Sequence, residues 1–337
     1  MERMSNASLK KYNTFGLDVL AQEVTAVEQV EDLSNLRNEG VFDRPHLIIG
    51  GGSNILLTRD FEGLVILNQM KGIQVVENSD NFSVVRFEGG EEWHSCVLWC
   101  IENDLGGVEN LSLIPGTVGA APMQNIGAYG VEIKDVFVRL EAFNKRTGQL
   151  EVFDKDACAF GYRESVFKNR FKDQFIITSV ELRLTRNQHS INTSYGAIQD
   201  VLSQQNIAVP SIRNVSDAVI SIRSSKLPDP KEIGNSGSFF KNPVVPKEKA
   251  NELLLQFPSM PNYPAPNGVK LAAGWLIEQC GWKGKRVGQT GAHARQALVL
   301  VNYGGAKGAE VWNLAKEIQQ SVAARFGVQL QPEVNVI

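Results

Sequence analysis

The stretch Gly50-Gly51-Gly52-Ser53-Asn54 follows a short apolar run, Leu47-Ile48-Ile49, which predicts a β-strand. Because glycine has no Cβ atom, successive backbone N–H groups in such a stretch can converge on an anion, and Ser53 and Asn54 add donors. A tight turn between strands is equally compatible, since apolar runs follow at 55–57 and 64–67. The stretch is no Gly-x-Gly-x-x-Gly fingerprint, because position 55 is isoleucine, and the chain has no Gly-x-x-x-x-Gly-Lys-Ser/Thr loop.

A second segment rich in small residues runs from Ile114 to Gly130. It contains Ile114-Pro115-Gly116-Thr117-Val118-Gly119-Ala120-Ala121 and ends with Gln124-Asn125-Ile126-Gly127-Ala128-Tyr129-Gly130. So many small residues make a poor core, because each glycine costs chain entropy and buries little area. They suit a place where a flat, wide ligand lies against the backbone. Two such loops predict a site for a large phosphorylated cofactor.

Composition excludes several classes of protein. The chain has 337 residues, which predicts two or three domains, and its 43% hydrophobic and 21% charged residues are typical of a folded globular protein. A net charge of −3 argues against a nucleic-acid partner. Prolines and amides interrupt the longest uncharged stretch, 110–131, so no membrane span is expected. The scattered cysteines and histidines predict neither a metal site nor disulfides, and the N-terminal residues show no secretory signal. We expect a cytoplasmic protein with reduced thiols.

Hydrophobic periodicity predicts an α+β fold. Val27, Val30, Leu33 and Leu36 form a helical stripe that ends near Gly40. From residue 73 onward, apolar residues alternate with polar ones, as at 136–142 and 180–184, which is typical of antiparallel strands with one solvated face. A helix around 97–101 interrupts them. Strands in runs, rather than in strict alternation with helices, favour α+β over a doubly wound sheet.

A separate C-terminal unit is predicted after a linker. Lys226-Leu227-Pro228-Asp229-Pro230 has too many prolines for a helix or a sheet. Beyond it, the pattern predicts a helix at 271–280, a strand at 297–301 and a longer helix that carries the apolar residues of 311–326 on one face. Gly281 and Gly327 follow the two helices as stop signals.

A set of motifs spread over nearly the whole chain resembles the UDP-N-acetylenolpyruvoylglucosamine reductase family, flavoenzymes of bacterial peptidoglycan-precursor synthesis. Besides the two glycine-rich loops, the motifs are Asn13-Thr14-Phe15-Gly16, Gly161-Tyr162-Arg163, Gly237-Ser238-Phe239-Phe240-Lys241-Asn242-Pro243 and Pro332-Glu333-Val334. Ser194-Tyr195-Gly196 resembles the substrate-covering loop of the longer family type. Each motif alone is weak, but their order and spacing are specific.

The resemblance implies three domains, of which two form an FAD-binding fold shared with vanillyl-alcohol oxidase. Residues 1–70, joined by the returning strand 330–337, and residues 71–222 would form these two, and 226–329 would bind the substrate. Some flavoproteins of this fold attach flavin through a histidine just after the glycine run. This chain has Ser53-Asn54 there, so we expect FAD to bind without a covalent bond.

The reaction that the resemblance implies is reduction of an enolpyruvyl ether to a lactyl ether. NADPH passes hydride to FAD, and reduced flavin passes it to the vinyl carbon, so that an enediolate develops and must be stabilised and protonated. The guanidinium of Arg163 matches a carboxylate and stays charged when desolvated. Glu333 would act as a neutral acid or orient other donors. Ser238 would donate the proton, with Ser236 as a rival two residues away. The family often has arginine where this chain has Asn335, which changes the charge expected around Glu333.

The remaining predicted site residues fall into two groups. The predicted cofactor contacts are Gly50, Gly51, Gly52, Ser53, Asn54, Ile114, Pro115, Gly116, Thr117, Gly119, Ala120, Gly127 and Arg223. The predicted substrate contacts are Tyr195, Lys226, Asn242 and Gln296. Lys241 and Lys283-Gly284-Lys285-Arg286 fit either a phosphate ligand or a solvated surface. The expected partners are UDP-N-acetylglucosamine enolpyruvate and NADPH, bound by a monomer.

Two other functions are compatible with the same loops. A flavin oxidase would use oxygen on a small alcohol, and a flavin-free sensor would bind nucleotide sugars on the same scaffold. The joint presence of Arg163, Ser238 and Glu333 favours the reductase over the sensor.

Overall fold

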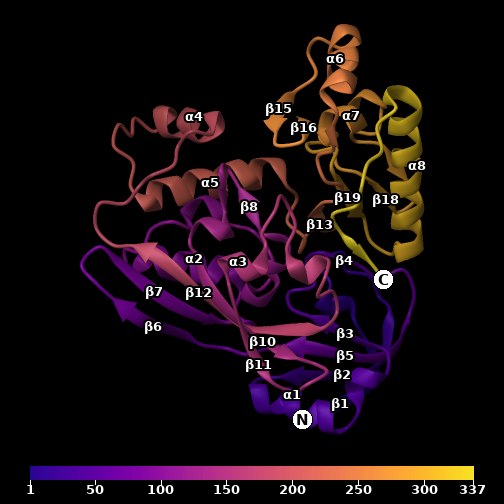
Figure 1. Cartoon of the computed structure of the whole chain (residues 1–337). Coiled ribbons are helices and arrows are strands. Elements are labelled where there is room, and N and C mark those ends of the chain that lie inside the picture. Colours follow the sequence, from indigo (N-terminus) through magenta and orange to yellow (C-terminus); the bar gives the residue numbers. More distant parts are fainter. The chain divides into compact units, whose positions relative to one another are not determined.

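In the computed structural model, which describes residues 1–337, interleaved segments of the chain build two units (Figure 1). The first unit consists of residues 1–7, 21–51 and 62–224. The second consists of residues 8–20, 52–61 and 225–337. The chain therefore passes from one unit to the other within the first glycine-rich loop. None of its helices is long and apolar enough to cross a membrane.

A four-stranded sheet lies at the start of the first unit. Its strand order is β1 (Arg3–Ser8), β2 (Leu20–Val27), β5 (Phe61–Asn68) and β3 (His46–Ile49). The predicted strand at 47–49 is thus confirmed as β3, and it runs parallel to β5 with Ile49 opposite Leu67. This pairing places the first glycine-rich loop directly after the carboxyl end of β3.

The predicted helical stripe from Val27 is wrong at its first residue. Val27 ends β2, and helix α1 covers Val30–Asn38. The reason is a capping box: the side chain of Gln29 and that of Asp32 each accept a backbone N–H at the helix start. Leu33 and Leu36 then pack with Val27 in one core. Gly40 follows the helix with φ 70°, which confirms it as the stop.

A five-stranded antiparallel sheet forms the larger part of the first unit. Its order is β11 (Leu150–Asp154), β10 (Phe137–Asn144), β12 (Phe175–Thr185), β7 (Phe82–Glu88) and β6 (Ile73–Asn78). The predicted helix around 97–101 is confirmed as α2 (Trp93–Glu102), whose buried face packs on the sheet. Figure 1 shows β12 between β10 and β7. The predicted α+β organisation is confirmed.

One face of this sheet is less solvated than the alternation at 180–184 predicts. Glu181 is only 5% exposed. Arg139 of β10 stands opposite Glu181 in the strand register, and its guanidinium donates to both carboxylate oxygens at 2.9 and 3.0 Å. An ion pair across neighbouring strands therefore covers a position that the sequence pattern marks as open to water.

Three further helices complete the first unit. They are α3 (Lys155–Cys158), α4 (Gly196–Gln204) and α5 (Ile212–Lys226), whose last two residues belong to the second unit. The sequence analysis did not identify α4 or α5. Ile198 and Leu202 of α4 pack against Val215 and Val219 of α5, which makes a small core of its own. Short strands β8 (Gly127–Ala128) and β9 (Val131–Glu132) form a hairpin inside the second glycine-rich segment.

The second unit has a mixed core of sheets and helices. One sheet has the order β13 (Gly234–Ser238), β19 (Val299–Asn302), β18 (Thr290–Ala292) and β17 (Arg286–Val287). Another has the order β14 (Val244–Val245), β16 (Gly268–Leu271) and β15 (Asn262–Ala265). The helices are α6 (Lys247–Gln256), α7 (Ala273–Gln279) and α8 (Gly308–Phe326). The predicted strand at 297–301 and both predicted helices are confirmed, and Gly327 ends α8 with φ 64°.

The C-terminal strand of the second unit pairs with the segment after the first glycine-rich loop. β20 (Asn335–Val336) runs parallel to β4 (Ile55–Leu56), and Asn335 stands opposite Ile55. Phe240 also bridges to Pro332. The C-terminal segment 332–336 thus pairs both with residues 55–56 and with Phe240.

Candidate functional site

The two glycine-rich loops touch each other through their backbones. A Cβ atom at Gly51 would lie 2.9 Å from the Cα of Gly116, and a Cβ atom at Gly50 would overlap the hydroxyl of Thr117. At Gly51 the clash is with the backbone of the other loop, whereas at Gly50 it is with the side chain of Thr117. The structure therefore brings together the two loops that the sequence analysis assigned to one cofactor.

The first loop leaves three consecutive donors free. The N–H groups of Gly51, Gly52 and Ser53 donate to no atom of the chain. Gly52 has φ 59°, and its carbonyl accepts from Thr14 N at 3.1 Å. Backbone donors are nearly always paired unless they face water or a ligand. Gly51 is exposed and Ser53 is half-buried, so these donors are open to water or to an anion, as the anion interpretation requires.

In the second loop, the backbone N–H groups of residues 119 and 120 are already paired within the chain. Gly119 N donates to Gly89 O at 2.8 Å, and Ala120 N donates to Thr117 O at 3.0 Å. Pro115 is exposed, while Ile114 packs against the core of the first unit. Of these predicted cofactor residues, Thr117, Gly119 and Ala120 line a cavity.

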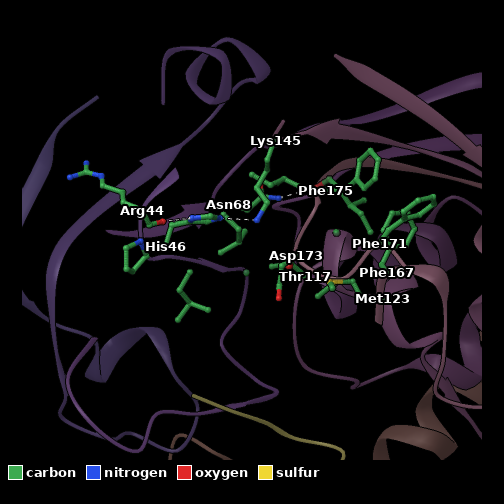
Figure 2. Close-up of a pocket in the computed structure, with 18 residues that line it drawn as sticks. Arg44, His46, Asn68, Thr117, Met123, Lys145, Phe167, Phe171, Asp173 and Phe175 are labelled. Atoms are coloured by element: carbon green, nitrogen blue, oxygen red, sulfur yellow. Dashed lines mark hydrogen bonds between the residues drawn. The ribbon is translucent and has the colours of Figure 1, made fainter. Parts of the chain in front are cut away.

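This cavity, of about 410 Å³, lies wholly within the first unit and has the size of a small-molecule pocket (Figure 2). Besides the loop residues, its polar lining includes Asn68, His46, Lys145 and Asp173. Its aromatic lining consists of Phe167, Phe171 and Phe175. The sequence analysis missed these residues, because they come from separate strands and loops and form no local motif.

Arg163 lies on the carbonyl groups of the second glycine-rich segment. Its guanidinium donates to Gly127 O at 2.6 Å and, more weakly, to Asn125 O at 3.4 Å. The residue sits in a turn closed by the bridge between Gly161 and Glu164 and has φ 56°. Two predicted site residues, Arg163 and Gly127, are therefore in direct contact.

A second guanidinium, that of Arg223 on α5, is close to the first. Its Nε donates to Leu113 O at 3.2 Å, and the guanidinium also bonds the hydroxyl of Tyr129. Burial lowers the pKa of Arg223, and the charge of Arg163 lowers that pKa further, against the opposing effect of Tyr129. Burial in turn raises the pKa of Tyr129. No carboxylate lies within salt-bridge distance of Arg223, so its hydrogen-bond partners in the chain are uncharged.

Tyr195 covers Tyr129. The edge of one ring meets the face of the other, with centroids 5.1 Å apart and an interplanar angle of 86°. Tyr195 is 48% exposed at the start of α4. The buried Asn110 links the segment around Tyr129 to the segment before Tyr195. Its Nδ2 donates to Tyr129 O at 3.1 Å and to Asn192 O at 3.0 Å. Neither Asn110 nor Tyr129 was assigned a role from the sequence.

In the second unit the two rival serines differ sharply. Ser236 is 8% exposed, and its hydroxyl donates to Ile55 O at 3.4 Å. Ser238 is exposed, and its hydroxyl has no partner in the chain. Only Ser238 is open to a substrate.

Glu333 is held near Ser238 and the end of the first loop. Its N–H donates to Phe239 O at 2.8 Å, and its carbonyl accepts from Asn54 Nδ2 at 3.3 Å. Asn335, where the family often has arginine, donates through both its backbone N–H and its Nδ2 to Asn54 O, each at 3.0 Å. Asn335 therefore fixes Asn54 rather than supplying a positive charge.

Two of the predicted substrate contacts in this unit, Asn242 and Gln296, lie beside the start of α7, where a Cβ atom at Gly274 would be 3.0 Å from Gln296 Oε1. Asn242 Oδ1 accepts from Ala273 N at 3.0 Å, and Gln296 Oε1 accepts from Leu298 N at 3.3 Å. Lys226 is exposed at the end of α5. In the cluster at 283–286, Lys283 pairs with Glu278 at 2.9 Å and Lys285 lies over the ring of Trp282. These contacts favour the surface interpretation for that cluster.

The comparisons with known proteins define the class. The family model "FAD binding domain" matches residues 21–154, a range that includes both glycine-rich loops. With three free N–H groups for a pyrophosphate and loops that exclude any side chain, the residues present fit FAD. The protein is an FAD-dependent oxidoreductase.

The family follows from residues 229–337, which match "UDP-N-acetylenolpyruvoylglucosamine reductase, C-terminal domain", and from full-length relatives. A protein of that name from Flavobacterium johnsoniae is 53% identical over 100% of both chains. One from Pseudomonas aeruginosa is 50% identical over 100% of this chain and 99% of its own. The crystal structure of the Thermus caldophilus reductase has the same fold, with a TM-score of 0.68, 24% identity and coverage of 99% and 98%. The chain belongs to the UDP-N-acetylenolpyruvoylglucosamine reductase family, so the resemblance is confirmed.

Replacement of Gly51 by alanine tests the contact between the two loops. Because the new Cβ meets backbone rather than a flexible side chain, we expect the loops to separate and the flavin content of purified protein to fall at least several-fold, while circular dichroism stays unchanged. The flavin-to-protein absorbance ratio measures this. Gly196→Ala is the matched control, because nothing lies within 4 Å of a Cβ there. A Gly51→Ala protein with full flavin content would contradict the assignment.

Proposed function

We propose that this chain catalyses the NADPH-dependent reduction of UDP-N-acetylglucosamine enolpyruvate to UDP-N-acetylmuramate, a step of peptidoglycan-precursor synthesis in the cytoplasm. The observation that carries the proposal is the 53% identity, over the full length of both chains, to a relative named for this reductase activity. The chemistry of the described residues supports it. Arg163 and Arg223 are two neighbouring cations, and Ser238 is an exposed hydroxyl.

The two glycine-rich loops would hold the cofactor. FAD, when bound, takes two electrons from NADPH and supplies them to the double bond of the substrate. The free N–H groups of Gly51, Gly52 and Ser53 would bind its pyrophosphate, and Arg223 would bind one of its polar groups. The side chains after the glycines are those of Ser53 and Asn54, which do not form the histidyl bond of covalent flavoproteins, so the cofactor would be held without a covalent bond.

Arg163 would stabilise the negative charge that develops on the substrate carboxylate. A guanidinium offers a fixed fork of donors and remains charged in a desolvated site. Its hydrogen bond to Gly127 O, together with a backbone held at φ 56°, fixes the direction of that fork before substrate arrives. Stabilisation prepared in this way acts on the transition state more than on the substrate.

Ser238 would then donate the proton to the carbon beside the carboxylate, with Glu333 assisting. The hydroxyl of Ser238 is exposed, and the backbone of Glu333 bonds the residue next to it, so both belong to one rigid segment of the second unit. A fixed donor lowers the entropic cost of proton transfer. Tyr195, Lys226, Asn242 and Gln296 would contact the remainder of the substrate, Tyr195 as a cover that rests on Tyr129.

Absorption spectra of the purified protein test this function against its two alternatives. We expect yellow protein that anaerobic NADPH bleaches and that UDP-N-acetylglucosamine enolpyruvate then recolours. An oxidase would instead be bleached by a small alcohol and recoloured by oxygen. Colourless protein that binds UDP-sugars would indicate a sensor. Either of the last two outcomes would contradict the proposal.

Replacement of Ser238 by alanine should separate the two half-reactions. Because its hydroxyl is proposed to act after the flavin is reduced, bleaching by NADPH should remain, while substrate turnover falls by about 10²–10⁴-fold. Stopped-flow absorbance measures both steps. Ser236→Ala is the matched control and should keep its turnover, since that hydroxyl bonds Ile55 O. Equal loss of bleaching and turnover in Ser238→Ala would exclude the proton-donor role.

Replacement of Arg163 by lysine keeps the charge but removes the planar fork. We expect a folded, yellow protein whose kcat falls by about 100-fold, because an ammonium group cannot make the paired hydrogen bonds of a guanidinium. Steady-state kinetics with saturating NADPH measures the effect. Near-normal kcat would show that charge alone suffices, and the proposed role of the fork would then be wrong.

A further inference from the structure

Lys145 is a cation in the wall of the cavity without an anionic partner. It follows the last residue of β10, and its Nζ lies 2.7 Å from Nε2 of His46 on β3 (Figure 2). Nδ1 of His46 lies 2.8 Å from Arg44 O, a carbonyl that can only accept. Nδ1 therefore carries the hydrogen, and Nε2 is the acceptor for Lys145.

The ammonium group has donors to spare. Of its three N–H groups, one is used by His46, and no carboxylate lies within salt-bridge distance. The side chain is half-buried and passes over the ring of Phe42. Burial lowers the pKa of Lys145, and the carboxylate of Asp173, another cavity residue, opposes that effect. Burial likewise lowers the pKa of His46, which favours its neutral, accepting form.

A partly desolvated ammonium group with unused donors calls for acceptor atoms from a ligand. FAD is the ligand that the matched domain binds, and the cavity begins at Gly50 and Thr117, beside the loop that suits a pyrophosphate. The pyrophosphate lies in the middle of FAD, between its flavin half and its adenosine half. Arg163, Arg223 and Tyr129 do not line the cavity. If they serve the flavin half, the cavity is left for the adenosine half, and Phe171 and Phe175 offer aromatic surfaces for its base.

We propose that Lys145, oriented by His46, donates a hydrogen bond to an acceptor atom of the adenosine half of FAD and thereby selects FAD over FMN. Asp173 offers the complementary acceptor for an amino or hydroxyl hydrogen of the same half. The role is one of cofactor specificity, and it rests on the FAD dependence and the pyrophosphate position proposed above, not on the identity of the reduced substrate. If the proposal is wrong, the assignment of the chain as a reductase therefore still stands.

The test measures binding of FAD and of FMN to protein freed of flavin, by flavin fluorescence and calorimetry at fixed pH and salt. Lys145→Met removes the donor and keeps the length of the side chain. We expect its dissociation constant for FAD to rise about 10- to 100-fold, the usual effect of losing a hydrogen bond from a charged group. Binding of FMN, whether strong or weak, should not change, because FMN lacks the adenosine half.

Three further variants separate orientation from charge. His46→Leu removes the acceptor that holds Lys145 and should weaken FAD binding in the same direction, whereas His46→Gln keeps an acceptor and should stay within about three-fold of the unmodified protein. Lys172→Met removes an equal charge from an exposed residue next to Asp173 that does not line the cavity, and should have no effect.

Three results would overturn the proposal: unchanged FAD affinity in Lys145→Met, an equal loss for FMN and FAD, or an equal loss in Lys172→Met. Circular dichroism of each flavin-free variant checks its fold. If Lys145→Met does not fold, the comparison of His46→Leu with His46→Gln decides, and equal FAD affinities in that pair count against the proposal.

Discussion

The close approach of Gly51 to Gly116 is the constraint on which the candidate cofactor site depends. The N–H groups of residues 51–53 donate to no atom of the chain, and the rest of the first unit keeps the second loop in place. Gly116 O accepts from Trp93 N at 3.0 Å, and Val118 N donates to Glu91 O at 2.9 Å. The residues at the start of α2 therefore pair with the second loop as one β-strand pairs with another. Because Trp93 is itself buried in the sheet core, the packing of that core fixes the position of the site.

Two pairs of cations in the first unit differ in their partners. On the face of the five-stranded sheet, Arg86 and Arg139 are paired with glutamates, and these pairs belong to the structure itself. Arg223 and Lys145, by contrast, have no carboxylate within salt-bridge distance, and burial lowers the pKa of each. A folded chain tolerates such groups where a ligand supplies the missing acceptors. The distribution of unpaired charge thus points to the same loops as the glycines do.

Local patterns in the sequence predicted the elements that interactions between neighbouring residues determine. These elements are both glycine-rich loops, strand β3, helices α2 and α8, and the end of α8 at Gly327. They could not predict contacts that only the register of distant strands creates. His46 and Lys145 are 99 residues apart, and nothing near either marks the pair. Ser236 was a rival to the preferred Ser238 only two residues away, and residues two apart in a regular strand share a face. A register shift between Asn235 and Ser238, with Gly237 at φ 67°, separates them, so that one is buried and the other exposed.

Backbone strain at the site follows the same division between local preference and tertiary structure. Leu113, Tyr129 and Arg163 have φ between 50° and 57°, a region that residues with large side chains rarely adopt and that costs on the order of 1–3 kcal/mol each. Glycine at these positions would relieve the strain but would remove the tyrosine hydroxyl and the guanidinium, and Leu113 places the carbonyl that Arg223 contacts. The surrounding core must offset the cost, and it gains little by doing so unless these directions matter. The strained backbones at these three residues set the positions of the Leu113 carbonyl, the Tyr129 side chain and the Arg163 guanidinium.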